Sequence, residues 1–249
     1  QTSADLVGSG TASDPYLVTS TDDWNLIANK LRSGGAQNSK HYKLTADITV
    51  SDRLGTPDYP FRGTFDGDGH TLTAVFGSPD EYLDMICSPF YSIQDATIRN
   101  LIVDGNIYTS GQYTGGLVGK AFGLENLIQN CVSRVSINSN RDGDCSNGGF
   151  VGLMNTNSTH VDFKGCAFTG ELVGTNATNW GGFVGWRNYV SQNRNTANFT
   201  DCLFAPTKVD IAMPDGSNSC TFSRSNEIGL NISYKNCYYQ TSLQINDGG

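Results

Sequence analysis

The sequence has few basic residues, no long apolar run and only three histidines. Sixteen Lys and Arg residues stand against 24 Asp and Glu residues, so the formal net charge is −8. This balance argues against nucleic acid and anionic membranes as partners, because both require basic patches. No stretch approaches the roughly 18 consecutive apolar residues of a membrane span. We therefore expect neither a nucleic-acid partner nor a membrane span.

The sequence also lacks the spacings of a metal site. It contains no Cys-x-x-Cys pair, and its histidines are scattered. The segments 66–69 and 142–144 alternate Asp with Gly, but no twelve-residue calcium-loop pattern ending in Glu follows them. Turn formation explains both segments better, since Asp bonds the backbone and Gly tolerates positive φ. We expect no metal and no cofactor.

Charged residues make up only 16% of the chain, too few for an array of helical repeats. What the chain has is a repeat of 33 residues: Gly-Gly-Leu-Val-Gly at 115–119 returns as Gly-Gly-Phe-Val-Gly at 148–152 and at 181–185. Short stretches rich in Val, Ile, Phe and Tyr lie between Gly, Asn, Ser and Asp, as in strands joined by turns. The fold class predicted is all-β, a parallel β-helix in which each coil pairs with its neighbours.

A second ladder of residues runs in phase with the glycine repeat. Successive coils place equivalent residues about 4.8 Å apart, so like side chains stack on like. We expect two interior columns, for which packing is a better explanation than catalysis. One consists of Leu117, Phe150, Phe183 and Phe222, and the other of Leu101, Cys131, Cys166, Cys202 and Cys237.

Residues 1–249 are expected to form a single β-helix domain, with a cap and first coil in 1–50 and stacked coils in 51–249. Within the cap, Trp24, Leu26, Ile27 and Leu31 are spaced as one apolar helical face. Thr21 or Asp22 can cap this short helix, and Gly34-Gly35 can end it. The helix would cover the exposed edge of the first coil, with Trp24 as its plug.

Several segments together resemble bacterial GLUG-motif surface proteins. The likeness is carried by the repeats above and by residues 8–11, 14–17, 42–48, 61–72 and 96–101. It implies a right-handed β-helix on an exported protein, often part of a multidomain adhesin or an immunoglobulin-A-cleaving peptidase, with no defined active site in this segment. Cys87–Tyr91 departs from the motif, so an irregular coil is expected there, and Cys220–Ser223 has lost its glycines.

Seven cysteines leave at least one thiol unpaired in a monomer. In-register parallel strands point their Cβ atoms the same way, which favours free thiols that pack as small apolar groups in the ladder. Cys87, Cys145 and Cys220 have loop-like surroundings and are the better disulfide candidates, with their pairing open.

Aromatic residues gather around the third glycine repeat. Trp186-Arg187-Asn188-Tyr189 follows it and Trp180 precedes it. Flat rings beside polar side chains suit sugars, so Trp186, Arg187, Tyr189 and Trp180 form the candidate ligand-binding site. The alternative is that both tryptophans pack beneath a loop at 190–198; it is the favoured interpretation for Trp180, while Trp186 fits either.

Three functions follow from these observations. The first is a non-catalytic adhesive module, secreted or on a bacterial cell surface, that binds a glycan or a host surface protein. The second is a carbohydrate-active β-helix enzyme, a glycoside hydrolase or polysaccharide lyase, which requires two carboxylates about 5–10 Å apart in a cleft. The third is a structural stalk. Candidate acids for the enzyme are Asp66, Asp68, Asp104, Asp142, Asp144 and Glu171. We favour the first function and assign no catalytic residue, ligand identity or oligomeric state.

Overall fold

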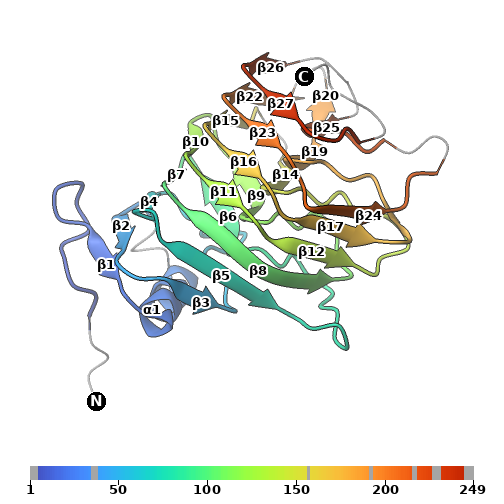
Figure 1. The fold of residues 1–249 in the computed structure, drawn as a ribbon. Coiled ribbons are helices and arrows are strands. Elements are labelled where there is room, and N and C mark those ends of the chain that lie inside the picture. The colour runs from blue at the N-terminus through green and yellow to red at the C-terminus, as the bar shows by residue number, and fades with distance from the viewer. Residues whose placement is uncertain are drawn as a thin grey trace.

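The computed structural model describes residues 5–34, 39–155, 158–190, 193–214, 218–225 and 231–243, with backbone only at 189–190 and 193–194. It confirms the predicted all-β class: the chain winds as a parallel β-solenoid with one short helix near its N-terminus (Figure 1). The middle coils contribute strands to three sheets, and successive coils stack along one axis.

The first sheet has eight strands, and every neighbouring pair in it is parallel. Its side chains alternate between the core and the solvent, as the period of a strand requires. We name it the eight-stranded sheet. In stacking order it consists of β1 (Tyr16–Val18), β2 (His41–Leu44), β4 (Thr64–Asp66), β7 (Thr97–Arg99), β10 (Asn126–Gln129), β15 (His160–Lys164), β22 (Thr196–Thr200) and β26 (Ile232–Lys235).

The second sheet has ten strands, and we name it the ten-stranded sheet. Its longest strand, β8 (Ile102–Thr109), pairs with two shorter strands of the next coil. The others are β3 (Ile48–Val50), β5 (Thr71–Phe76), β11 (Val132–Ser133), β12 (Ser136–Ser139), β16 (Ala167–Phe168), β17 (Glu171–Gly174), β23 (Leu203–Phe204), β24 (Lys208–Ile211) and β27 (Tyr238–Tyr239).

The third sheet carries the glycine repeat and has five strands. They are β6 (Phe90–Gln94), β9 (Val118–Phe122), β14 (Val151–Met154), β19 (Val184–Arg187) and β25 (Ser223–Ser225). Two short pairs lie outside these sheets: β13 (Gly143–Asp144) with β18 (Ala177–Thr178), and an antiparallel hairpin of β20 (Tyr189–Val190) with β21 (Asn193–Arg194).

The repeated glycines allow backbones to approach one another closely. A Cβ at Gly115 would collide with the carbonyl oxygen of Val118, and one at Gly152 with that of Tyr113. At 87–91, where an irregular coil is expected, residues 87–89 lie outside the strands and Phe90 opens β6, pairing with Val118 in register. A register shift is also present at β25, between Val184 and Arg187.

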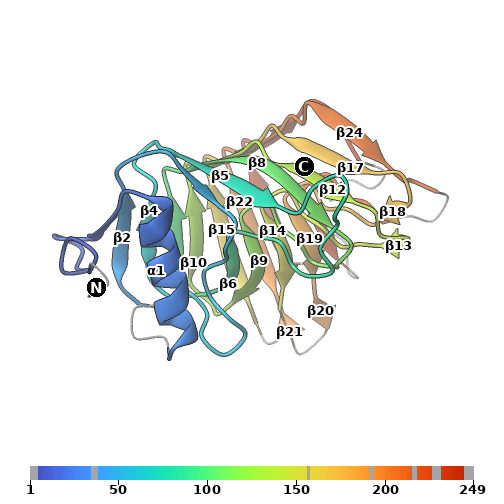
Figure 2. The same cartoon turned by 90° about the horizontal axis from the view of Figure 1, so that it is seen from below.

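Helix α1 (Thr21–Arg32) covers the first coil, as predicted (Figure 2). Its cap is Ser20 rather than Thr21 or Asp22, because the Ser20 hydroxyl accepts the Asp23 N–H at 3.2 Å. Trp24 is fully buried, packs edge-on against Phe65 and Phe90, and donates through Nε1 to the Asp52 carbonyl. The helix ends one residue before Ser33, and Gly35 lies outside the described residues. No helix in the described part is long and apolar enough to cross a membrane.

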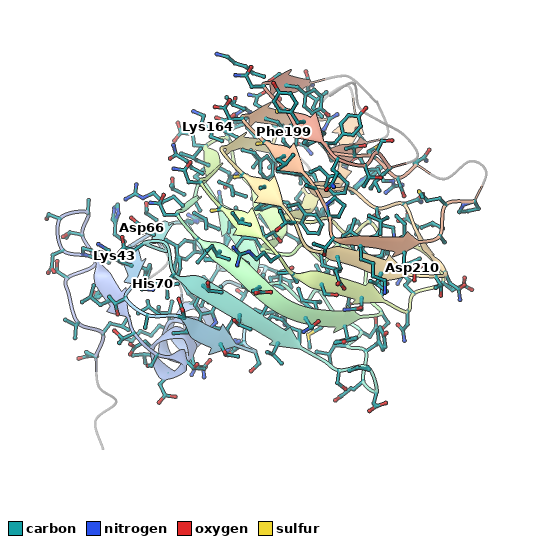
Figure 3. The ribbon with its side chains drawn as sticks, in the orientation of Figure 1. Lys43, Asp66, His70, Lys164, Phe199 and Asp210 are labelled. Carbon is teal, nitrogen blue, oxygen red and sulfur yellow. The ribbon has the colours of Figure 1, made fainter. Side chains whose placement is uncertain are left out.

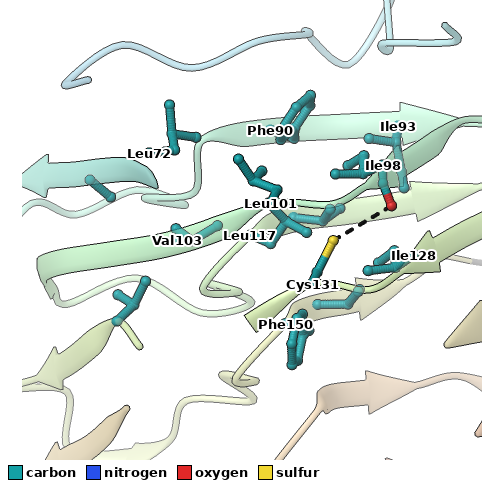
Figure 4. Close-up of a cluster of buried hydrophobic side chains, with 14 of the residues drawn as sticks. Leu72, Phe90, Ile93, Ile98, Leu101, Val103, Leu117, Ile128, Cys131 and Phe150 are labelled. Carbon is teal, nitrogen blue, oxygen red and sulfur yellow. Dashed lines mark hydrogen bonds between the residues drawn. The ribbon is translucent and has the colours of Figure 1, made fainter. Parts of the chain in front are cut away.

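Both predicted interior columns are present. The Phe150 and Phe183 ring centroids lie 4.8 Å apart, and those of Phe183 and Phe222 lie 5.3 Å apart. In the other column, each thiol donates to a backbone carbonyl of the preceding coil, as Cys131 does to Ile98 in Figure 4. The core is therefore an ordered stack of like side chains.

All seven cysteines lie in the described part of the chain, and each is a thiol rather than half of a disulfide. The expectation that Cys87, Cys145 and Cys220 form disulfides is therefore wrong. All three are buried: Cys87 and Cys145 lie outside the strands, where Cys145 donates to the Thr178 carbonyl at 3.2 Å, and Cys220 bridges Gly181. Burial raises the pKa of Cys87 to about 11 and that of Cys145 to about 12.

Candidate functional site

Trp186 lies on the outer face of the five-stranded sheet, in register with Leu153 and Lys120. It is partly exposed, but one face of its ring is covered by Arg224, whose Cζ lies 4.4 Å from the ring centroid. Arg224 is anchored there, because Nη1 donates to the Ser146 hydroxyl at 2.8 Å and Nη2 to Asp144 at 3.5 Å. One face of the Trp186 indole is therefore occupied by the Arg224 guanidinium.

The other three residues of the predicted site have no side chain that the structure describes at the surface. Side chains alternate along β19, so Arg187 points inward, fully buried, in the column of Ala121 and Met154, and donates to the Asn195 carbonyl at 3.1 Å. Trp180 is also fully buried. The expectation that these two contribute to a surface site is wrong, and the side chain of Tyr189 lies outside the described residues.

The favoured alternative for Trp180, that it packs inside the protein, is confirmed by its full burial. Its Nε1 donates to the Ala177 carbonyl at 3.0 Å, and its backbone N–H donates to the Ser219 hydroxyl at 3.0 Å. A Cβ at Gly174 would lie 3.1 Å from the indole. Trp180 therefore packs against β17 and β18. The segment 190–198 includes residues outside the described part of the chain.

Four of the candidate acids, Asp66, Asp68, Asp144 and Glu171, have structural partners. Asp66 accepts the Asp68 N–H at 2.8 Å, which is the expected turn. Asp144 accepts the Ser146 hydroxyl at 2.6 Å, and Glu171 accepts the Ser136 hydroxyl at 3.0 Å. Among the described residues, no three His, Cys, Asp or Glu side chains converge as metal ligands.

A row of cations that the sequence reasoning missed crosses the outer face of the eight-stranded sheet. Lys43, Arg99, Lys164 and Lys235 occupy equivalent positions on β2, β7, β15 and β26, and we name them the cationic row. On the strands between them, β4, β10 and β22, the equivalent positions are occupied by Asp66, Gln129 and Thr200. Figure 3 shows Lys43, Asp66 and Lys164 along the same side of the molecule. The row therefore repeats on every second strand, about 9.6 Å apart.

The charges of the row are unequally compensated. Arg99 donates to Asp66 at 3.2 Å, and Lys43 lies 3.6 Å from Asp68. Lys164 and Lys235 are exposed and form no ion pair with any carboxylate in the described part of the chain. These two lysines are the cations of the row most available to a partner.

The carboxylate of Asp66 is held in its ionised form. Burial alone would raise its pKa, but hydrogen bonds from the Asp68 N–H, Asn100 and Arg99 bring the pKa below its usual range. Asp66 therefore stays charged beside Arg99 at neutral pH and fixes the orientation of that guanidinium.

A second row of polar groups runs beside the first. His160 and Asp162 lie 2.9 Å apart, Asn198 donates to Asp162 at 3.1 Å, and Ser233 donates to Asn198 at 2.6 Å. These bonds link three successive coils across the sheet. The face thus offers hydrogen-bonded donors and acceptors next to the exposed cations Lys164 and Lys235.

The cationic row ends in a hollow of about 300 Å³ beside the N-terminal loop, which we name the end pocket. The loop is held by its own bonds, including those from the Ser9 and Thr11 amides to the Asp14 carbonyl. The pocket is lined by Ala12, Ser13, Pro15, His41, Tyr42, Lys43, Thr64, Asp66 and Arg99.

Comparison with known proteins gives few matches. No family model matches the chain. Halomucin of Haloquadratum walsbyi is 29% identical over 173 residues, which are 63% of this chain and 2% of halomucin. The chain therefore spans a very small part of that relative's length.

A solved structure from Bacteroides ovatus, named as a candidate immunoglobulin A1 protease, superposes with a TM-score of 0.61. The superposition covers 96% of this chain and 81% of the other, at 19% identity. It shows that the two chains share a fold.

Proposed function

We propose that the chain is a non-catalytic binding module of a secreted or cell-surface bacterial protein, and that it holds a linear acidic glycan along the cationic row. The observation that carries the proposal is the register of Lys43, Arg99, Lys164 and Lys235 on alternate strands of an exposed sheet. A long, flat, polar face fits a long polar polymer better than it fits a small molecule.

The spacing of the row supports a polymer with a repeating acid. Two strands span about 9.6 Å, close to the length of one disaccharide in an extended polysaccharide. An acidic group on alternate sugars would then meet a cation at each step. The neighbouring hydroxyl and amide groups of Asn198 and Ser233 suit sugar hydroxyls.

Each contact in such an arrangement is weak, so the row must act as a set. An exposed ion pair contributes roughly 0–1 kcal/mol, and salt screens it further. Several ion pairs with one polymer give a higher affinity than a single pair. After the first pair has formed, the remaining pairs form within the same complex at a high effective concentration. Binding is therefore expected to strengthen with polymer length and to weaken with salt.

The location at a cell surface rests on likeness. The resemblance to GLUG-motif surface proteins, the fold shared with the Bacteroides ovatus protein and the match to halomucin support it. The partly exposed Trp186 remains an alternative point of contact for a ligand on the same module.

The test is calorimetric titration with hyaluronan oligosaccharides of increasing length, with neutral chitin oligosaccharides as the control ligand. Lys164→Gln/Lys235→Gln removes the two cations that form no ion pair among the described residues, and it should weaken hyaluronan binding by about fivefold or more. The matched control, Arg134→Gln/Lys208→Gln, makes the same charge change at exposed positions flanking or within the ten-stranded sheet and should bind normally.

A charge-neutral rearrangement tests the spacing itself. Gln129→Lys/Lys164→Gln moves one cation by a single strand and keeps the net charge, so it should weaken binding if the period matters. Equal binding by all variants would reject the row as the site, and loss of binding in Trp186→Ala alone would move the site to Trp186. Unchanged oligosaccharide lengths after incubation are expected for a non-catalytic module.

A further inference from the structure

A second hollow of about 340 Å³ lies apart from the cationic row, between the last turn of α1 and two loops of the first coils. None of its lining residues belongs to the end pocket. We name it the arginine pocket. It is lined by Arg32, Arg53, Gly55, Thr56, Pro57, Met85, Ile86 and Tyr91.

Arg53 is the fixed cation of this pocket. Its Nη1 donates to the Ile86 carbonyl at 2.7 Å, and its Cζ lies 4.8 Å from the centroid of the Tyr91 ring. It forms no ion pair with any carboxylate of the described residues. A guanidinium held by stacking and one hydrogen bond keeps further N–H donors for a planar anion.

The other arginine of the pocket is already neutralised. Arg32 donates to both carboxylate oxygens of Asp52 and, at 3.1 Å, to Asn29. Asp52 also accepts the backbone N–H of Arg53 at 2.8 Å. The carboxylate is therefore occupied by Arg32 and the backbone, and the pocket carries one uncompensated positive charge.

The wall of the pocket formed by Gly55, Thr56 and Pro57 is preformed. The Ser92 hydroxyl donates to the Thr56 carbonyl at 2.6 Å, and the Thr56 and Tyr59 segments bond each other at 3.0 and 2.9 Å. Gly55 has φ +90°, and a Cβ there would lie 2.6 Å from the Ser92 carbonyl oxygen. Because these residues are already ordered without a ligand, binding costs little conformational entropy, and this favours affinity.

We propose that the arginine pocket binds one acidic monosaccharide, with the carboxylate on Arg53 and the ring against the apolar side chains of Met85, Ile86 and Pro57. The single net charge matches one carboxylate. The volume suits one sugar residue and not a polymer segment. The residue is either a free sugar acid or the terminal residue of a glycan.

The test is saturation-transfer NMR and calorimetry with four probes: N-acetylneuraminate, 3′-sialyllactose, glucuronate and acetate, with lactose as the neutral control. Arg53→Met keeps the stem but removes the charge, and should weaken acidic-sugar binding roughly tenfold. Met85→Asp places a negative charge on an exposed rim residue and should weaken binding more than Met85→Ala, which only removes an apolar contact, while Arg134→Met should leave binding unchanged.

Met85→Asp keeps the test valid if Arg53→Met fails to fold, because the Met85 side chain is 40% exposed. Preference for 3′-sialyllactose over the free acids would identify a glycan end, and the reverse a free sugar acid. The proposal would be overturned if N-acetylneuraminate, 3′-sialyllactose and glucuronate all failed to bind, if acetate bound as tightly as they do, or if Met85→Asp bound them as tightly as the unaltered protein. Lys164→Gln/Lys235→Gln should leave this binding intact, so the two proposed sites can fail separately.

Discussion

Arg224 lies across the indole of Trp186 and reaches Asp144, two coils below its own strand. Its side chain is 6% exposed. Burial lowers the pKa of Arg224, and the charge of Asp144 opposes that shift. The stack therefore ties three successive coils together at the C-terminal half of the solenoid.

We expect Arg224→Met to uncover Trp186. Trp24 and Trp180 are fully buried, so acrylamide quenching of tryptophan fluorescence reports mainly on Trp186. Quenching by acrylamide should rise in Arg224→Met. In Trp186→Phe, the fraction of the fluorescence that acrylamide can quench should disappear. Unaltered quenching in Arg224→Met would contradict the stacking. Arg134→Met serves as the surface control.

Truncation within the phenylalanine column should be costly. Phe183→Ala removes a fully buried ring that contacts Phe150, Phe163, Phe199 and Phe222. We expect the free energy of unfolding to fall by about 3–5 kcal/mol. Leu203→Ala, whose side chain is 38% exposed in the ten-stranded sheet, should change it by less than about 1 kcal/mol. Urea unfolding measures both, and similar losses in the two variants would contradict the column.

The thiols should be unreactive in the folded protein. Burial raises the pKa of Cys145 to about 12, and hydrogen bonding with Cys202 raises that of Cys237. Because the thiolate is the reactive form, iodoacetamide at pH 8 should modify little of the native chain and all seven cysteines in urea. Cys237, which is only partly buried, should react first. Rapid modification of Cys145 before unfolding would refute this expectation.

Asp66 should contribute stability above its usual pKa and lose that contribution in acid. Its folded-state pKa is depressed, so stability is present at neutral pH and falls as pH drops through that depressed value, below about pH 4. Asp66→Asn should cost about 1 kcal/mol at pH 7 and less at pH 3. Urea titrations at both pH values measure this difference. An equal cost at pH 7 and pH 3 would contradict a stabilising role for the ionised Asp66.

The period of 33 residues was enough to predict the solenoid, because one glycine repeat and one cysteine ladder hold phase over several coils. The columns of Phe150 and Cys131 followed from that phase. The cap of α1 at Ser20 differed by one residue, since Ser20, Thr21 and Asp22 are all competent caps.

The candidate site was harder to predict, because a residue can contribute to it only if its side chain lies on the outer face of its strand. Trp186 and Arg187 are adjacent, yet only one can point outward, and the cation that reaches Trp186 comes from Arg224 in the next coil. Lys43, Arg99, Lys164 and Lys235 are unequally spaced in the sequence, because loops of different length separate their strands. Only the register of the coils brings them into one row.

The alternation of cations along the eight-stranded sheet has a consequence for how such a chain can change its length. Inserting or deleting a single coil between Lys164 and Lys235 would put the terminal lysine out of step with a polymer that repeats every two strands. Gaining or losing coils in pairs would preserve the match. Homologous chains that bind the same polymer should therefore differ by even numbers of coils.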